Sequence, residues 1–175
     1  MGESAGRTLC PGSTDPPEPA RATSDWLAHT QQEPRQAHRE WADTGVALLP
    51  LGRRFEAARL PAPLVLAAVD TWDPLEITER LHRFLNGPVL FDGRLTGGTF
   101  YALMQPHRAS QVWKYQDVAP RLGANTYLGV PRMERVKPPG THWVAPPRFP
   151  GDLCEPATVE ALIGFGLSIT QEAEL

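Results

Sequence analysis

The chain has 175 residues, which is enough for one domain with a buried core, and its 41% hydrophobic and 21% charged residues are ordinary for a globular protein. Its net charge of −3 argues against a dedicated duplex-DNA binder, because such proteins carry a basic face. The 19 prolines predict short helices and strands with many turns between them.

The hydropathy pattern and the cysteines bear on the compartment. The sequence contains no apolar run of about 18 residues and no basic-then-apolar signal peptide, so we expect no membrane span and a cytoplasmic protein. The two cysteines, Cys10 and Cys154, form no C-x-x-C pair. In a reducing compartment both are expected to be free thiols.

The first part of the chain differs in composition from the rest. Residues 1–23 are rich in Pro, Gly, Ser and Thr and have almost no apolar side chain, so they cannot bury enough surface to offset the entropy of ordering. We therefore predict a disordered tail over 1–23. Ser24 is a suitable N-cap for a first helix over about 25–32, and a second helix with a proline in its first turn is expected over about 33–43.

The following segment predicts a hairpin and two helices. An apolar strand over 46–51, a Gly-Arg turn and a returning strand over 54–60 are typical of a hairpin. One helix is expected over 63–72. The next helix has the clearest boundaries in the chain, since Asp73 is a good N-cap with a proline directly after it, and Asn86, followed by glycine, is a good stop.

The second half of the chain alternates strands with shorter elements. Strands over 88–92 and 98–105 predict a second hairpin, and a short helix is expected over 107–113. A further strand pair is expected over about 126–132 and 140–145, with a Pro-rich loop between its strands.

A closing helix begins at Glu155 and carries Val159 and Leu162 on its apolar face. The order of the elements predicts one α+β domain over 24–175. We expect a mostly antiparallel sheet that is built from hairpins, with the helices packed on one face.

Established catalytic and metal-binding motifs are missing from the sequence. None of the five histidines occurs in an H-x-x-x-H pair, and no G-x-S-x-G, P-loop or G-x-G-x-x-G motif is present. Asp70 and Asp73 are close enough in sequence to form an acid pair, but their places at helix ends explain both residues. Arg53 and Arg54 at the expected hairpin tip are candidate phosphate contacts, although arginines in turns are most often simply solvated.

Three segments carry a family resemblance. The stretches PVLFDGR (88–94), TGGTFYALMQP (96–106) and TYLGVPRMERVKPPGTHWVAPP (126–147) together resemble the N-terminal domain of the bifunctional DNA primase/polymerases, in particular its short actinobacterial branch. The resemblance covers about 25–170. It implies a primase-like α+β core, nucleotidyl transfer with two metal ions held by acidic residues, and a histidine that contacts the incoming triphosphate.

The first two motifs of that family are altered in this chain. The first motif is a strand ending in two acids one residue apart; Asp92 stands at the first acidic position, but Arg94 stands at the second. The second motif is a Gly-Gly turn with a histidine two residues beyond it. Gly97 and Gly98 are present, but Phe100 stands at the histidine position. Asp92 is thus the single remaining motif acid, and it cannot by itself organise a two-metal site.

The third motif of the family is altered as well. It has an acid several residues before a strand, and here Tyr127 is in register with the strand while the preceding residues hold no acid; Asp117 is the nearest one and lies outside the expected position. The resemblance implies a candidate ligand-binding cleft formed by Asp92, Arg94, Gly97, Gly98, Phe100, His107, Arg108 and Tyr127. Phe100 and Tyr101 point to opposite faces of their strand, so one of them is a candidate platform for stacking a base.

Three functional hypotheses follow. The first is a non-catalytic primase/polymerase-like domain with a regulatory or binding role, which has no catalytic residues, metal or other cofactor and binds a protein partner, with weak binding of a nucleotide or single-stranded nucleic acid as a further option. The second is an active nucleotidyltransferase that requires Mg²⁺ or Mn²⁺. The third is a small scaffold protein that shares only the fold with the family.

Overall fold

A five-stranded antiparallel sheet lies at the centre of the computed structural model, which describes residues 17–94 and 96–175. In the order β5-β2-β4-β3-β7, its strands are β5 (Arg121–Leu122), β2 (Glu56–Pro61), β4 (Thr99–Met104), β3 (Val89–Asp92) and β7 (His142–Ala145). A second, two-stranded antiparallel sheet is formed by β1 (Val46–Pro50) and β6 (Tyr127–Pro131). Residues 1–16, which belong to the predicted disordered tail, lie outside the described part of the chain.

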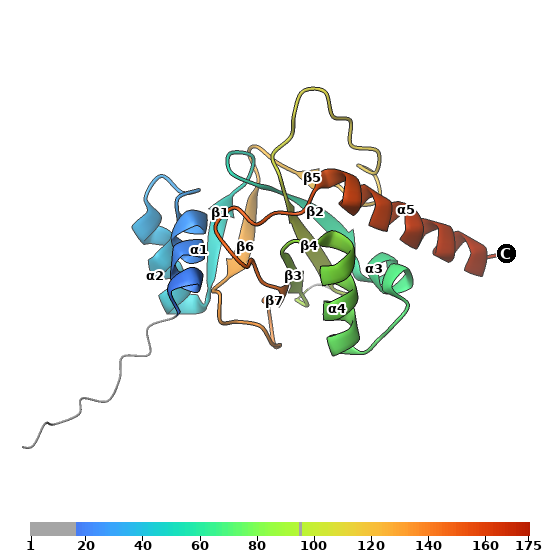
Figure 1. Cartoon of the computed structure of the whole chain (residues 1–175), viewed down its shortest axis with the longest axis horizontal. Helices are drawn as coiled ribbons and strands as arrows, with labels where there is room; N and C mark the ends of the chain where they lie inside the picture. Colours follow the sequence, from blue (N-terminus) through green and yellow to red (C-terminus); the bar gives the residue numbers. More distant parts are fainter. Residues whose placement is uncertain (1–16, 95) are drawn as a thin grey trace, which may run out of the picture.

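The described residues also form five helices, and together with the two sheets they confirm the α+β class. They are α1 (Glu18–Ala28), α2 (Pro34–Thr44), α3 (Ala62–Val69), α4 (Pro74–Leu85) and α5 (Pro156–Ala173). Figure 1 shows α3, α4 and α5 on one side of the molecule and α1 and α2 on the other, beside the two-stranded sheet. None of these five helices is long and apolar enough to cross a membrane.

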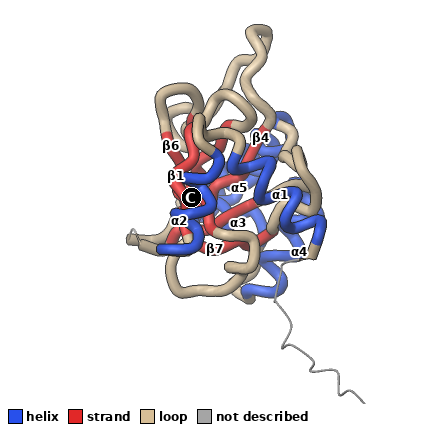
Figure 2. The backbone as a smooth tube through the Cα atoms, turned by 90° about the vertical axis from the view of Figure 1, so that its left-hand side faces the viewer, coloured by secondary structure: helices blue, strands red, loops and turns tan. Residues whose placement is uncertain are grey.

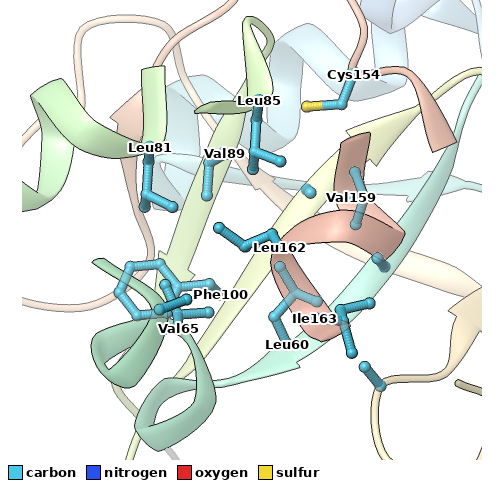
Figure 3. Close-up of a cluster of buried hydrophobic side chains, with 14 of the residues drawn as sticks. Leu60, Val65, Leu81, Leu85, Val89, Phe100, Cys154, Val159, Leu162 and Ile163 are labelled. Carbon is cyan, nitrogen blue, oxygen red and sulfur yellow. The ribbon is translucent and has the colours of Figure 1, made fainter. Parts of the chain in front are cut away.

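The first hydrophobic core lies between the five-stranded sheet and the helices α3, α4 and α5. Every second residue of the strands faces these helices, as Leu60 of β2 and Phe100 of β4 do. Leu81 of α4 and Leu162 of α5 close the cluster from the helical side (Figure 3). This layer of α3, α4 and α5 corresponds to the expected packing of helices on one face of the sheet.

A second core covers the opposite face of the same sheet. The alternate residues of its strands, among them Leu90 and Leu103, face the two-stranded sheet, which contributes Leu49 and Val130. Helices α1 and α2 complete this core, and the indole of Trp41 donates a hydrogen bond of 2.9 Å to the Val130 carbonyl. The central sheet is therefore covered on both faces, by different kinds of layer.

Helix α4 confirms the clearest boundary prediction. The Asp73 carboxylate accepts hydrogen bonds from the backbone N–H groups of Leu75 (2.9 Å) and Glu76 (3.1 Å), as an N-cap should. At the other end, Asn86 takes the left-handed conformation with φ 48° and stops the helix. The hairpin formed by β3 and β4 is also confirmed.

Two predicted strand pairings are wrong. β1 and β2 do not form a hairpin, because β1 pairs with β6 while β2 pairs with β4 and β5. Leu51 and Phe55 in the connection between them are buried, so the chain crosses from one sheet to the other instead of turning back on itself. β6 and β7 do not pair with each other either, because the loop over 132–141 carries the chain from β6, which pairs with β1, to β7, which pairs with β3.

The helix expected over 107–113 does not form. These residues begin an irregular segment that leads to β5 and rises above the sheets, and it is drawn as a loop in Figure 2. Val112 is 82% exposed and takes no part in either hydrophobic core. The segment is held instead by single contacts, such as the hydrogen bond of 2.8 Å from the Trp113 indole to the Ala119 carbonyl.

Two other helix boundaries differ from the prediction. Helix α1 begins at Glu18 instead of near Ser24, because prolines fit the first turn of a helix and Thr23 is buried within it. Residues 18–23 are therefore helical and do not belong to a disordered tail. Helix α3 ends at Val69, before Trp72, because Asp70 takes a left-handed conformation with φ 49°.

Candidate functional site

The turn between β3 and β4 sets the geometry of the candidate site. Gly97 and Gly98 have φ values of 85° and 74°, in the left-handed region where glycine has no steric penalty. A Cβ atom on Gly98 would also clash with the Phe91 ring. The double glycine is thus required by the local backbone, and these two positions of the turn carry no side chain.

Asp92 and Arg94 form an ion pair at the end of β3. One carboxylate oxygen of Asp92 accepts hydrogen bonds from the backbone N–H (3.0 Å) and the Nε–H (2.9 Å) of Arg94, and the other accepts one from Nη2 (2.7 Å). The side chain of Asp92 is nearly buried, whereas that of Arg94 is 67% exposed. Hydrogen bonds from Arg94 lower the pKa of Asp92 despite its burial, so the carboxylate stays ionised.

Three further side chains share the sheet face of this pair. The β3–β4 register places Thr99 opposite Asp92, and the β2–β4 register places Arg59 opposite Tyr101. Burial raises the pKa of the Tyr101 hydroxyl, on which the charges of Arg59, Asp92 and Arg94 also act. We call this group the polar shelf; its members are Arg59, Asp92, Arg94, Thr99 and Tyr101.

A cavity of about 500 Å³ adjoins the polar shelf. Arg59, Thr99 and the Gly97–Gly98 turn form one wall, and Asp117 comes from the loop before β5 to line the other. Arg59 is exposed, and among the described residues its guanidinium takes part in no ion pair. The cavity therefore offers a guanidinium without an ion-pair partner beside a backbone turn, which suits an anionic group, although Asp117 lines the same cavity.

The structure brings together four of the eight predicted cleft residues: Asp92, Arg94, Gly97 and Gly98. Phe100 lies on the opposite face of β4, buried in the first core with its ring centroid 4.8 Å from that of Phe91. His107 and Arg108 follow the other end of β4, and both are exposed.

Tyr127, the remaining predicted residue, lies on the outer face of the two-stranded sheet. Two members of the polar shelf, Arg59 and Thr99, were missed from the sequence. The signal in the sequence for Arg59 was a single arginine within an otherwise apolar strand. Which residues of β4 lie beside it depends on the β2–β4 register, which the sequence does not reveal.

Asp92 lies at this end of the sheet, and Asp117 lines the adjoining cavity. Within residues 17–94 and 96–175, no three His, Cys, Asp or Glu side chains gather as metal ligands would. Because both oxygens of Asp92 already accept hydrogen bonds from Arg94, the residues present do not fit the two-metal site that the family resemblance implies. No family model matches the chain, and comparison with curated proteins and with solved structures gave no significant match either.

Proposed function

We propose that the chain is a non-catalytic binding domain with a primase/polymerase-like core, whose polar shelf binds a phosphate-bearing ligand, such as a nucleotide, without transforming it. The ion pair between Asp92 and Arg94 is the observation that carries this proposal. A metal ion would have to displace a guanidinium that donates two hydrogen bonds to Asp92 and that repels the ion. Arg94 thus stands where the family has its second acid, and it forms an ion pair with Asp92, the acid that remains.

The charges of the shelf support binding of an anion. Arg94 is neutralised by Asp92, but the guanidinium of Arg59 is exposed at the rim of the adjoining cavity and is available for a charge-assisted hydrogen bond. Backbone turns rich in glycine allow phosphate oxygens to approach closely, and the Gly97–Gly98 turn lies in the same cavity. Tyr101 adds a hydroxyl beside these groups.

Titration of the full chain with a fluorescently labelled nucleotide, read by anisotropy with and without Mn²⁺, tests the proposal. We expect binding that needs no Mn²⁺ and that weakens about tenfold in Arg59→Ala, the loss of one charge-assisted hydrogen bond. Arg83→Ala, which removes an exposed arginine from α4, should leave the affinity unchanged. Binding that requires Mn²⁺ and disappears in Asp92→Ala would contradict the proposal and favour an active enzyme.

The position of Asp117 favours that active nucleotidyltransferase as the second candidate function. Asp117 lines the same cavity as the Gly97–Gly98 turn, so a second acid does lie at this end of the sheet. This candidate predicts incorporation of nucleoside triphosphates that depends on Mg²⁺ or Mn²⁺ and is lost in Asp117→Asn. The variant Arg94→Asp separates the candidates further. It removes the ion-pair partner of Asp92 and places two acids one residue apart, as in the family motif. Under our proposal, this variant binds Mn²⁺ and the natural chain does not.

A further inference from the structure

A continuous groove passes over the outer face of the two-stranded sheet and along the loop between β1 and β2, on the side of the molecule where α1 and α2 lie (Figure 1). Two hollows of about 650 and 660 Å³ share Gln31, Gln32 and Arg53, so they adjoin each other. We call them together the glutamine groove. It shares no residue with the polar shelf or with the cavity beside it, so the inference goes beyond the proposed function and does not depend on it.

One half of the groove combines apolar side chains with amides. The register of β1 and β6 places Leu48, Pro50 and Tyr127 on the outer face, where Leu48 is 57% and Tyr127 is 62% exposed. The Gln31 amide donates a hydrogen bond of 2.9 Å to the Leu48 carbonyl, while its own oxygen is buried without a hydrogen-bond partner in the described part of the chain.

The edge of β1 is already closed by side chains. The carbonyl of Leu48 accepts from Gln31, and its N–H donates to the Glu40 carboxylate at 2.8 Å. A ligand therefore lies over the outer face of the sheet and does not add a strand at this edge. Glu40, the only carboxylate among the described residues that line the two hollows, also accepts a hydrogen bond of 2.9 Å from Gln36, so both of its oxygens are engaged within the protein.

The other half of the groove is basic. His29, Arg53 and Arg54 line it together with two glutamines and a proline. The Arg54 guanidinium lies 5.8 Å from the centre of the Trp26 ring, which fixes its position and leaves most of its N–H groups free. Among the described residues, neither arginine takes part in an ion pair. A chain of net charge −3 thus concentrates uncompensated positive charge at one end of an apolar groove.

We infer that the glutamine groove binds an extended, acidic peptide segment of a partner protein. An apolar side chain of the peptide packs on Leu48 and Tyr127, and its carboxylates meet Arg53 and Arg54. Side-chain amides carry both a donor and an acceptor, so the glutamines suit the N–H and C=O groups of an extended backbone. A single-stranded nucleic acid fits less well, because the groove offers one exposed aromatic ring where such sites use several.

An array of short fluorescent peptides, in which the numbers of Asp and Glu and the position of one Leu are varied, tests this inference with the full chain. We expect binding that requires both the acidic residues and the Leu, and that weakens as ionic strength rises. Arg53→Ala and Arg54→Ala should each reduce the affinity about tenfold, the loss of one charge-assisted interaction. Tyr127→Ala should reduce it as well, whereas Arg83→Ala, a matched loss of an exposed arginine on α4, should not.

Three results would overturn the inference. Peptides with Lys in place of Asp and Glu could bind equally well, the three groove variants could leave peptide affinity unchanged, or labelled oligothymidylate could bind more tightly than any peptide and respond to the same variants. Arg59→Ala distinguishes this inference from the proposed function. It should weaken nucleotide binding at the polar shelf and leave peptide binding unchanged, so either proposal can fail alone.

Discussion

The two ends of the central sheet carry two carboxylate–arginine pairs in opposite surroundings. At one end, which we call the closed end, Glu56 and Arg121 are 65 residues apart in sequence, and both side chains are less than a tenth exposed. At the other, the open end, Asp92 and Arg94 are two residues apart, and most of the arginine faces solvent. The same two functional groups, a carboxylate and a guanidinium, therefore occur once as a buried, long-range pair and once as a local pair with an exposed arginine.

The difference lies in what the remaining hydrogen-bonding groups contact. At the closed end, Glu56 also accepts a hydrogen bond of 3.0 Å from the backbone of His107, and Arg121 donates one of 2.9 Å to the Gln105 carbonyl. These bonds tie the irregular segment after β4 to the sheet. At the open end, Asp92 and Arg94 hydrogen-bond to each other, and a cavity adjoins the polar shelf. The long-range pair joins distant segments of the chain and is buried, whereas the local pair stays within one turn and presents its arginine to solvent.

The largest effect should come from the closed end. In Glu56→Gln the charge of Arg121 stays buried without a counter-charge, and loss of one partner of a buried ion pair costs about 3–5 kcal/mol in the free energy of unfolding. Urea denaturation followed by circular dichroism measures this loss in the free energy of unfolding. Arg94→Ala at the open end should cost less than about 1 kcal/mol, because the Arg94 side chain is 67% exposed and its truncation opens the Asp92 carboxylate to water.

The double variant Glu56→Gln/Arg121→Met provides the control for this comparison. Removal of both charges leaves no unpaired ion, so it should recover part of the stability that Glu56→Gln loses. If Glu56→Gln and Arg94→Ala lower the free energy of unfolding equally, the distinction between the two ends is wrong.

The second prediction concerns the turn at the open end. Gly98→Ala should destabilise the protein by about 2–3 kcal/mol, because the new methyl group meets the Phe91 ring and the backbone is left-handed. Gly97→Ala is a matched control with the same backbone strain but no atom within 4 Å of the new Cβ, so about 1 kcal/mol is expected. Thermal unfolding of both variants measures the difference, and equal losses would show that the Phe91 contact is unimportant.

Local signals in the sequence predicted some elements well. Asp73, Pro74 and Asn86 fixed the limits of α4, because capping and chain termination depend on neighbouring residues alone. Strand pairing depends on which surfaces become buried together, and adjacency in sequence predicted the wrong partners for β1 and β6. The sequence shows that Leu51 and Phe55, in the connection between β1 and β2, are apolar. It does not show that this buried connection crosses from one sheet to the other.

The candidate site divides in the same way. The neighbourhood of Asp92, Arg94 and the Gly97–Gly98 turn follows from a few consecutive residues and was predicted. Arg59 joins this group only through the β2–β4 register, which no local pattern encodes. His107 was placed in the predicted cleft by a motif resemblance, yet β4 carries it to the closed end, where its backbone bonds to Glu56.

The third prediction returns to the closed end. Cys154 is buried there, with its backbone N–H donating to the Leu103 carbonyl at 2.7 Å, and burial raises the pKa of its thiol to about 12. The thiol of the unfolded chain ionises near pH 8.5, so the stability is fully present below that pH and falls by about 1.4 kcal/mol per pH unit above it. Denaturation of the natural chain and of Cys154→Ala between pH 8 and 10 tests this; parallel curves would contradict it.

The smallest effect should be the acid response of the open end. Hydrogen bonds from Arg94 lower the pKa of Asp92 below its unfolded value near 3.9, so the pair stabilises the fold above that pH and loses its contribution as the pH falls through the lowered pKa. Because Arg94 is largely exposed, solvent screening limits the effect to less than about 1 kcal/mol. Denaturation at pH 6 and pH 3 should show a gap between the natural chain and Asp92→Asn that narrows in acid. Asp43→Asn on the exposed surface of α2 should show no such change, and a gap that persists at pH 3 would mean that Asp92 stabilises this end by packing and not by its charge.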